Sequence, residues 1–268
     1  MLLSEIFIYP IKALGGIALP AATVEPRGLQ YDRRWMLVDE FGMFFTQREI
    51  PELTFFRTEI KDNLLIIKRE GMGTLAVPLE MEERPASIPV QIWEDHCMAL
   101  PLQKEVDDWF CEALQRKCRL VYMPDSTHRQ TDLKYSQAGE IVSFADGYPF
   151  LIIGQASLED LNARLQHKIT IHRFRPNFVF TGGTPFEEDT WKRFSIGKLH
   201  FRAVKPCARC QVITVDLQTA TFGKEPLRTL SSYRLDGHKI LFGMNVCWDI
   251  ENTEAPHVRI GDTIEVLA

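Results

Sequence analysis

The sequence predicts a β-rich α+β fold with two domains and a few helices. The first hundred residues hold short runs of β-branched and aromatic residues, separated by Gly, Pro, Asn or Asp. Such short strands with regular turn signals are typical of a barrel or a sandwich. A polar stretch at residues 125–130 interrupts the pattern. We place the boundary just before it, which gives domains at residues 1–118 and 119–268.

Strands are predicted throughout the first domain. The β-prone runs are residues 2–9, 34–38, 44–46, 55–60, 64–68 and 74–77. Asp62 and Asn63 separate two of these runs, and this pair favours a β-hairpin turn. In the second domain, residues 258–266 are predicted as a strand, a Gly-Asp turn and a second strand, which is typical of a barrel closing on itself.

Three helices are predicted. Residues 103–117 carry apolar side chains at helical spacing, with acidic residues in the first turns. Residues 157–166 form the second helix, where Ser157 and Asp160 resemble a capping box. Pro226 begins a third, short helix.

Composition is that of an ordinary globular protein. The 268 residues are 45% hydrophobic and 25% charged. The net charge of −5 argues against a general nucleic-acid binder, because neutralising phosphates needs a basic surface. No signal peptide and no apolar run of the ~18 residues needed for a membrane span is found in the sequence. Six cysteines without a small disulfide framework indicate a reducing compartment, so we expect a cytoplasmic protein. From the net charge and the lack of an apolar span, we expect no nucleic-acid or membrane partner.

The most informative motif holds two cysteines three residues apart, Cys207 and Cys210. Lys205 and Arg209 flank Cys207, and nearby cations lower the pKa of a cysteine and favour the metal-binding thiolate. The β-branched residues that follow favour a strand that starts at Cys210. The spacing alone fits half of a zinc site, a thioredoxin-like redox pair, a single thiolate ligand for a transition metal, or buried packing cysteines.

Several cationic spots in this acidic chain suit a small anion. Lys12 precedes the Gly15-Gly16 turn, whose N–H groups are able to cradle a phosphate, although an ordinary turn with a solvated lysine fits as well. Arg33 and Arg34 adjoin a predicted strand, so one of them should point inward and need an anionic partner.

Two further segments extend this pattern. Arg173, Arg175 and Asn177 alternate along the chain and are predicted to share one face. Residues 144–155 lead into the N-terminus of the second predicted helix, which is a ready anion site. The sequence contains no G-x-G-x-x-G, P-loop, H-E-x-x-H or G-x-S-x-G motif.

Taken together, these segments resemble one known family. The motifs occur in the order Tyr9-Pro10-Ile11-Lys12, Asp32-Arg33-Arg34-Trp35, Thr46-Gln47-Arg48, Pro149-Phe150-Leu151-Ile152, Phe174-Arg175-Pro176-Asn177 and Cys207-Ala208-Arg209-Cys210. This order resembles the MOSC-domain proteins, and most of all the subgroup with the mitochondrial amidoxime-reducing component and its bacterial relatives. The resemblance spans residues 4–267.

The resemblance implies an N-terminal MOSC-type β domain packed on a C-terminal MOSC β-barrel, with a molybdenum cofactor (Mo-molybdopterin) between them. It makes Cys207 the metal ligand and the catalytic residue, a role that suits a soft thiolate. It assigns cofactor binding to Lys12, Arg33, Arg48, Arg175, Asn177 and Cys207. Relatives often carry a hydroxyl residue after the lysine; this chain has Ala13, so a Gly15 or Gly16 amide is the expected substitute.

The implied activity is that of a molybdenum-dependent oxidoreductase, which reduces small N-hydroxylated compounds by oxygen transfer to molybdenum. The alternative is a non-catalytic cofactor carrier or a sulfur-transfer protein. The chain has no flavin, dinucleotide, iron–sulfur or haem motif. We therefore expect a separate electron-transfer protein of the ferredoxin, flavodoxin or cytochrome type, with its reductase.

Overall fold

The computed structural model describes residues 1–81, 86–250 and 256–267. Its helices are α1 (Lys104–Leu114), α2 (Gln155–Arg164) and α3 (Leu227–Ser231), with 3-10 turns η1 (Pro51–Phe55), η2 (Ile171–Arg173), η3 (Glu187–Thr190) and η4 (Gln211–Thr214). Its strands are β1 (Leu2–Ile8), β2 (Ile17–Leu19), β3 (Ala21–Glu25), β4 (Gly28–Leu29), β5 (Trp35–Val38), β6 (Arg57–Lys61), β7 (Leu64–Lys68), β8 (Leu75–Pro78), β9 (Ile88–Ile92), β10 (Asp95–Pro101), β11 (Arg119–Tyr122), β12 (Phe150–Gly154), β13 (Phe178–Thr181), β14 (Arg193–Ile196), β15 (Leu199–Arg209), β16 (Leu235–Asp236), β17 (Lys239–Trp248), β18 (His257–Arg259) and β19 (Ile264–Val266).

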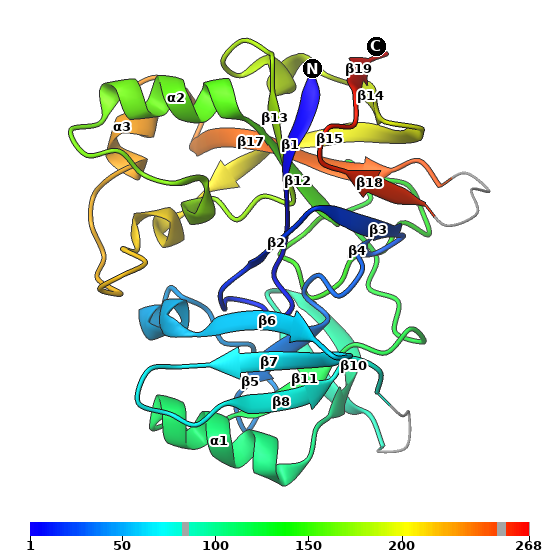
Figure 1. The fold of residues 1–268 in the computed structure, drawn as a ribbon, viewed down its shortest axis with the longest axis vertical. Coiled ribbons are helices and arrows are strands. Elements are labelled where there is room, and N and C mark those ends of the chain that lie inside the picture. The colour runs from blue at the N-terminus through cyan, green and yellow to red at the C-terminus, as the bar shows by residue number, and fades with distance from the viewer. Residues whose placement is uncertain (82–85, 251–255, 268) are drawn as a thin grey trace.

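One large sheet combines the C-terminal strands with the first two strands of the chain (Figure 1). Its order is β19-β14-β15-β17-β12-β13-β1-β2, with β16 paired to β17. β12 and β13 run parallel, whereas β1 is antiparallel to both of its neighbours. Helices α2 and α3 pack together against β12, β13 and β17. The start of the chain is therefore built into the C-terminal sheet.

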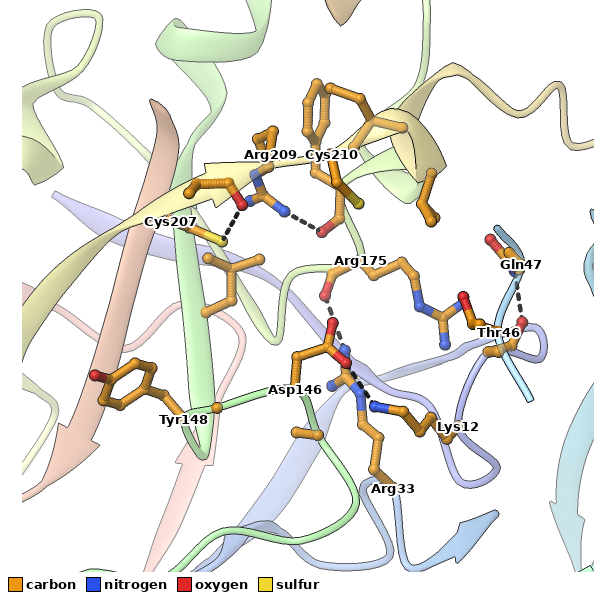
Figure 2. A pocket seen from close by; sticks show the side chains of 18 of the residues that line it. Lys12, Arg33, Thr46, Gln47, Asp146, Tyr148, Arg175, Cys207, Arg209 and Cys210 are labelled. Carbon is orange, nitrogen blue, oxygen red and sulfur yellow. Dashed lines mark hydrogen bonds and ion pairs between the residues drawn. The ribbon is translucent and has the colours of Figure 1, made fainter. Parts of the chain in front are cut away.

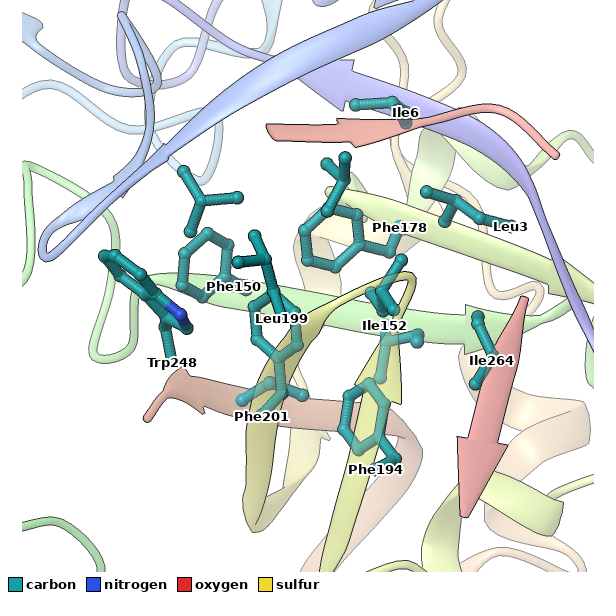
Figure 3. Packing of buried hydrophobic residues seen from close by; sticks show 14 of the residues in the cluster. Leu3, Ile6, Phe150, Ile152, Phe178, Phe194, Leu199, Phe201, Trp248 and Ile264 are labelled. Atoms are coloured by element: carbon teal, nitrogen blue, oxygen red, sulfur yellow. The ribbon is translucent and has the colours of Figure 1, made fainter. Parts of the chain in front are cut away.

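A phenylalanine-rich core fills the inner side of this sheet (Figure 3). The rings of Phe150 and Phe178 stack with their centroids 5.5 Å apart, and Phe201 meets both of them edge-on. Leu3 and Ile6 of β1 are fully buried in the same cluster. Aromatic burial of this kind contributes much of a domain's stability, so β1 is a structural part of this core.

The smaller sheets β5-β11-β10-β9 and β6-β7-β8 make up the lower part of Figure 1. A third small sheet, β18-β3-β4, lies above them and packs on the core of the large sheet. Helix α1 buries Val106, Phe110 and Ala113 in a second core, which also holds Trp35 and Phe56. Residues close in sequence to Lys12, Arg33 and Arg48 are buried in this second core, which fixes the segments that carry these cations.

The predicted β-rich α+β fold is confirmed. The three predicted helices correspond to α1, α2 and α3, and Pro226 caps the start of α3. The predicted hairpin joins β6 and β7, and both turn residues have positive φ, 51° at Asp62 and 60° at Asn63. A two-residue turn between twisted strands requires that geometry, and Asn and Asp tolerate it.

Two strand predictions were wrong. Residues 44–46, all of them described, lie outside the strands, and Phe44 makes only an isolated bridge to Val38. The residues after Cys210 form η4 instead of a strand. Ile213 is buried in a cluster with Phe174 and Phe242, so tertiary packing overrides the β preference of this segment.

The predicted strand, turn and strand at residues 258–266 are present as β18 and β19, but the two strands do not pair with each other. β18 pairs with β3, and β19 pairs with β14, so the two strands belong to different sheets. The turn between them is held by β1, because the Gly261 N–H donates to the Leu3 carbonyl oxygen over 2.8 Å. The segment thus ties two sheets together.

The domain boundary at 118/119 stays a prediction. β1 and β2 lie in the large sheet, while β11 pairs with β5. Strands from each side of the predicted boundary therefore pair with strands from the other side. Among the described residues, no helix combines the length and apolar character needed to cross a membrane.

Candidate functional site

A pocket collects residues from distant parts of the chain (Figure 2). Cys207 and Cys210 lie on one side, and Lys12, Arg33 and Arg175 lie on the other. The residues predicted for the site all line this pocket, namely Lys12, Arg33, Arg48, Arg175, Asn177 and Cys207. The fold thus brings together segments that are up to about two hundred residues apart in the sequence.

Cys207 sits at an irregular place in β15. The ladder between β15 and β17 shifts register between Ala203 and Lys205, and again between Pro206 and Ala208. Such irregularities re-aim side chains and occur often beside functional sites. The Cys207 side chain is half-buried and faces the pocket.

The pKa of the Cys207 thiol shifts in the opposite direction to the one predicted. Burial raises the pKa of the Cys207 thiol, and the Arg209 guanidinium offsets only part of that effect. Lys205 does not line the pocket, and its Nζ lies 4.4 Å from the centroid of the Tyr135 ring. The expectation that two flanking cations lower the pKa was wrong, because burial outweighs the Arg209 charge and Lys205 lies against Tyr135.

Lys12 is a buried cation in the wall of the pocket. Its Nζ donates to the Phe144 carbonyl oxygen over 2.8 Å and to Asp146 Oδ1 over 2.6 Å. Burial lowers the pKa of Lys12 to about 8, and Asp146 offsets part of that shift. The surrounding pocket walls act to raise the pKa of the Asp146 carboxyl, although water reaches this side chain, but the charge and hydrogen bond of Lys12 outweigh them and hold the pKa well below its usual range.

Two arginines pack against one tyrosine ring. The guanidinium carbons of Arg33 and Arg175 each lie 4.2 Å from the centroid of the Tyr9 ring. Arg33 is neutralised by Asp32, since its Nη1 donates to both carboxylate oxygens over 2.6 and 2.8 Å. Arg33 Nη2 also donates to the Arg175 carbonyl oxygen over 3.1 Å. These contacts hold the two cations side by side.

Arg175 keeps one donor without a partner. Its Nη1 donates to the Leu14 carbonyl oxygen over 2.6 Å, whereas its buried Nη2 has no hydrogen-bond partner within the described parts of the chain. Burial, and then the nearby Arg33 charge, lowers the pKa of Arg175 to about 10. A buried donor without a partner is costly, so this position fits an anion supplied from outside the chain.

Strained backbone gathers at the pocket. Ala13, Arg33, Trp93 and Arg175 all line it, and all have left-handed φ, between 50° and 69°. Residues other than glycine adopt this conformation at a cost of about 1–3 kcal/mol each, and such strain clusters at functional sites. The strain supports the assignment of this pocket as the functional site.

Arg48 and Asn177 have different surroundings. The Arg48 guanidinium carbon lies 4.4 Å from the centroid of the Trp93 ring, at the rim of the pocket. Asn177 uses its amide within the fold: Oδ1 accepts from the Leu151 N–H and Nδ2 donates to the Phe7 carbonyl oxygen, each over 3.2 Å. Asn177 therefore fixes β12 and β1 beside the pocket.

The other predicted arginines do not behave as expected. Arg34 is buried outside the pocket and donates to the Met123 carbonyl oxygen and to Asp125, so it does not point to solvent. Arg173 lies in η2 and pairs with Asp216 over 3.0 Å. Arg173, Arg175 and Asn177 do line the same pocket, but a 3-10 turn and the left-handed φ of Arg175 take the place of the extended geometry that was expected.

At two places where an anion was predicted to bind, the backbone N–H group donates to an acceptor of the chain itself. Helix α2 starts after Gly154, whose N–H donates to the buried Glu188 carboxylate over 3.1 Å. Ser157 is not the N-cap, and its hydroxyl donates to the same carboxylate over 3.0 Å. The Gly15 N–H donates to the Phe56 carbonyl oxygen, and a Cβ at Gly15 would lie 2.6 Å from that oxygen. Gly15 is thus required for close packing.

Sequence reasoning missed Asp146 and Trp93. Trp93 Nε1 donates to Asp146 Oδ1 over 3.2 Å, so the β9–β10 turn reaches the loop that carries Asp146. A tryptophan in a tight turn between two strands, at Ile92-Trp93-Glu94-Asp95, is the signal that was available. Its contact with Asp146 depends on the folded arrangement.

Comparisons with known proteins agree with this architecture. Residues 1–117 match the MOSC N-terminal beta barrel domain, and residues 139–265 match the MOSC domain. The chain is similar to mitochondrial amidoxime reducing component 2 of Bos taurus, with 34% identity over 87% of this chain and 72% of that protein. The Rattus norvegicus protein of the same name is 33% identical over 97% of this chain and 82% of that protein. The molybdenum cofactor sulfurase of Arabidopsis thaliana is 30% identical over 98% of this chain but only 35% of that protein.

Proposed function

Because the chain belongs to the MOSC-domain family, together with the amidoxime reducing components, we propose that it is a molybdenum-cofactor-dependent reductase of N-hydroxylated compounds. One observation carries the proposal. A half-buried thiol at Cys207 lines the same pocket as a buried Arg175 guanidinium donor that finds no hydrogen-bond partner in the described part of the chain. A soft sulfur and an anion site are what a molybdenum-bearing pterin phosphate needs from a protein.

The residues divide the binding of this cofactor between them. Cys207 would supply the sulfur ligand; burial favours the protonated thiol in the cofactor-free protein, so metal binding would have to release that proton. Lys12, Arg33 and Arg175 would bind the phosphate, and Arg175 Nη2 is the donor of these three that has no hydrogen-bond partner among the described residues. Arg48 borders the mouth, and Asn177 holds the strands in place.

The bound cofactor supplies the two-electron chemistry that cleaves the N–O bond. The chain contributes orientation, charge and shelter from water. Electrons come from a separate ferredoxin-, flavodoxin- or cytochrome-like protein and its reductase, and the substrate is a small N-hydroxylated molecule. We place the protein in the cytoplasm, without nucleic-acid or membrane partners, and we keep the domain division at residues 118 and 119.

Metal analysis followed by turnover tests this proposal. Protein from a molybdate-supplied host should contain molybdenum and pterin, and it should reduce benzamidoxime when reduced viologen supplies electrons. Protein that holds zinc in place of molybdenum, or that binds no pterin, would contradict the proposal.

A carrier or sulfur-transfer role is the second candidate. The similarity to molybdenum cofactor sulfurases supports it, although the chain spans about a third of those proteins. Protein that is loaded with molybdenum and pterin, yet inactive toward several N-hydroxylated substrates, would favour this candidate. Transfer of its cofactor to a cofactor-free acceptor enzyme would then identify a carrier.

A further inference from the structure

We propose that the Asp146 carboxylate is an exchangeable counter-ion for Lys12, and that it keeps simple anions out of the pocket of the cofactor-free protein. An anion that binds Lys12 has to displace this carboxylate first. The inference rests on the part of the proposed function that puts a phosphate against Lys12. It gives Asp146 a role in selecting what the pocket accepts.

The first step of the argument is the unequal exposure of the ion pair. The Lys12 side chain is 8% exposed, whereas the Asp146 side chain is 75% exposed and lines the pocket. Their charged atoms are 2.6 Å apart. A buried ammonium needs a partner, and here the partner is a carboxylate that water reaches easily (Figure 2).

The second step is that the backbone beneath Asp146 is held firmly. The buried Arg129 guanidinium donates to the carbonyl oxygens of Ser143 and Asp146, each over 2.9 Å, and also to that of Ala145. Asp95 in turn holds Arg129 over 2.7 Å. Because the loop is clamped, rotation of the exposed Asp146 side chain is the simplest way to free Lys12.

The third step is the contrast with Asp32. Asp32 is fully buried and accepts hydrogen bonds from the Tyr9 N–H over 2.7 Å and from Arg33. That carboxylate is a fixed part of the wall. Of the two carboxylates paired with the pocket's cations Lys12 and Arg33, Asp146 alone is exposed enough to leave.

An entering phosphate therefore meets opposing charges. The free Nη2 of Arg175 attracts it, while Asp146 repels it and occupies Lys12. On the Lys12 side of the pocket a free phosphate has only this contact to gain, because Arg209 Nη2, a second buried donor with no partner among the described residues, lies on the Cys207 side. A ligand that is also held at Cys207 gains from a second attachment, which raises its effective concentration at Lys12. The pocket thus favours a ligand that binds at Cys207 and at Lys12 together over a free phosphate.

Phosphate binding to the cofactor-free protein tests the inference. Calorimetry with inorganic phosphate would compare the unaltered protein with Asp146→Asn, which keeps an oxygen acceptor for Lys12 but removes the negative charge. We expect phosphate to bind Asp146→Asn at least about fivefold more tightly, as expected for loss of one nearby like charge. Asp125→Asn is the matched control, because Asp125 is 84% exposed and pairs with Arg34 over 2.7 Å outside the pocket.

The outcomes separate this inference from the proposed function. Adding Lys12→Gln to Asp146→Asn should abolish the gain in affinity. Unchanged or weaker phosphate binding by Asp146→Asn, together with weaker binding by Lys12→Gln and Arg175→Ala, would overturn the counter-ion role and leave the phosphate site standing. Phosphate binding that responds to neither Lys12→Gln nor Arg175→Ala would overturn the phosphate site and this inference with it.

Discussion

Cys207 is the residue on which the proposed metal chemistry depends. Its sulfur lines the pocket at a register shift in β15, and serine would offer a harder and weaker ligand. We expect Cys207→Ser to fold normally but to lose molybdenum and turnover, as measured by elemental analysis and by benzamidoxime reduction. Cys210→Ser should have a milder effect, because Cys210 lies beyond the end of β15, before η4. Full activity of Cys207→Ser beside an inactive Cys210→Ser would assign the metal to the other sulfur.

Arg175 offers the phosphate its free donor. Removing a charge-assisted hydrogen bond costs about 1.5–3 kcal/mol, so Arg175→Ala should lower phosphate or cofactor affinity by roughly 10- to 150-fold. The measurement is molybdenum occupancy after purification. Arg164→Ala is a suitable control, because Arg164 pairs with Asp160 on the surface of α2. Arg34→Ala is unsuitable, since Arg34 is buried and holds the Met123 carbonyl oxygen. Equal occupancy in Arg175→Ala and Arg164→Ala would rule out this role.

Lys12 makes anion binding dependent on pH. Burial lowers its pKa from 10.5 to about 8, so the cofactor-free protein loses this charge as pH rises through about 8. We expect its phosphate affinity to fall across that range, and Lys12→Arg should remove this step because arginine stays charged. The effect on stability has the opposite sign: between pH 8 and 10.5 the unfolded chain binds the extra proton, so Lys12 makes folding more favourable as pH rises. Phosphate affinity that is flat from pH 7.5 to 9.5 would contradict the assignment.

At the scale of the element, the start of α2 depends on Glu188. This buried carboxylate accepts from the Gly154 N–H and from the Ser157 hydroxyl. Glu188→Ala leaves both donors buried without an acceptor, which costs about 1–3 kcal/mol for each group. Urea unfolding should show that loss, and Glu188→Gln should recover part of it. A stability within error of the unaltered protein would show that water replaces the carboxylate there.

Elements decided by local chemistry were predictable, and those decided by distant contacts were not. The Asp62-Asn63 turn and helix α1 follow from turn residues and from apolar spacing. η4 and the separated strands β18 and β19 depend on packing around Phe174 and on pairing with β3 and β14. The site shows the same division. Motif order pointed to Lys12, Arg175 and Cys207, whereas the contact of Asp146 with Trp93 exists only in the folded chain.

At the scale of the whole molecule, the supply of electrons gives a further prediction. The sequence holds no flavin, dinucleotide, iron–sulfur or haem motif. We expect the purified chain to be inactive with NADH or NADPH alone and active with reduced viologen. A protein donor should dock transiently, so turnover with that donor should fall as salt rises. Turnover driven by NADH, with no other protein present, would point to a cofactor that the sequence does not reveal.

The place of β1 in the large sheet has a consequence for how the protein folds during its synthesis. The Ser4 hydroxyl bonds to the Val179 carbonyl oxygen, 175 positions later in the chain. At a synthesis rate of ~5–20 residues per second, β1 waits roughly 10–35 s on the ribosome before β13 exists. During that wait Leu3 and Ile6 have no core to enter. The pocket needs residues as far along the chain as Asn245, so it is completed late in synthesis, and the cofactor can be loaded only after that segment has emerged.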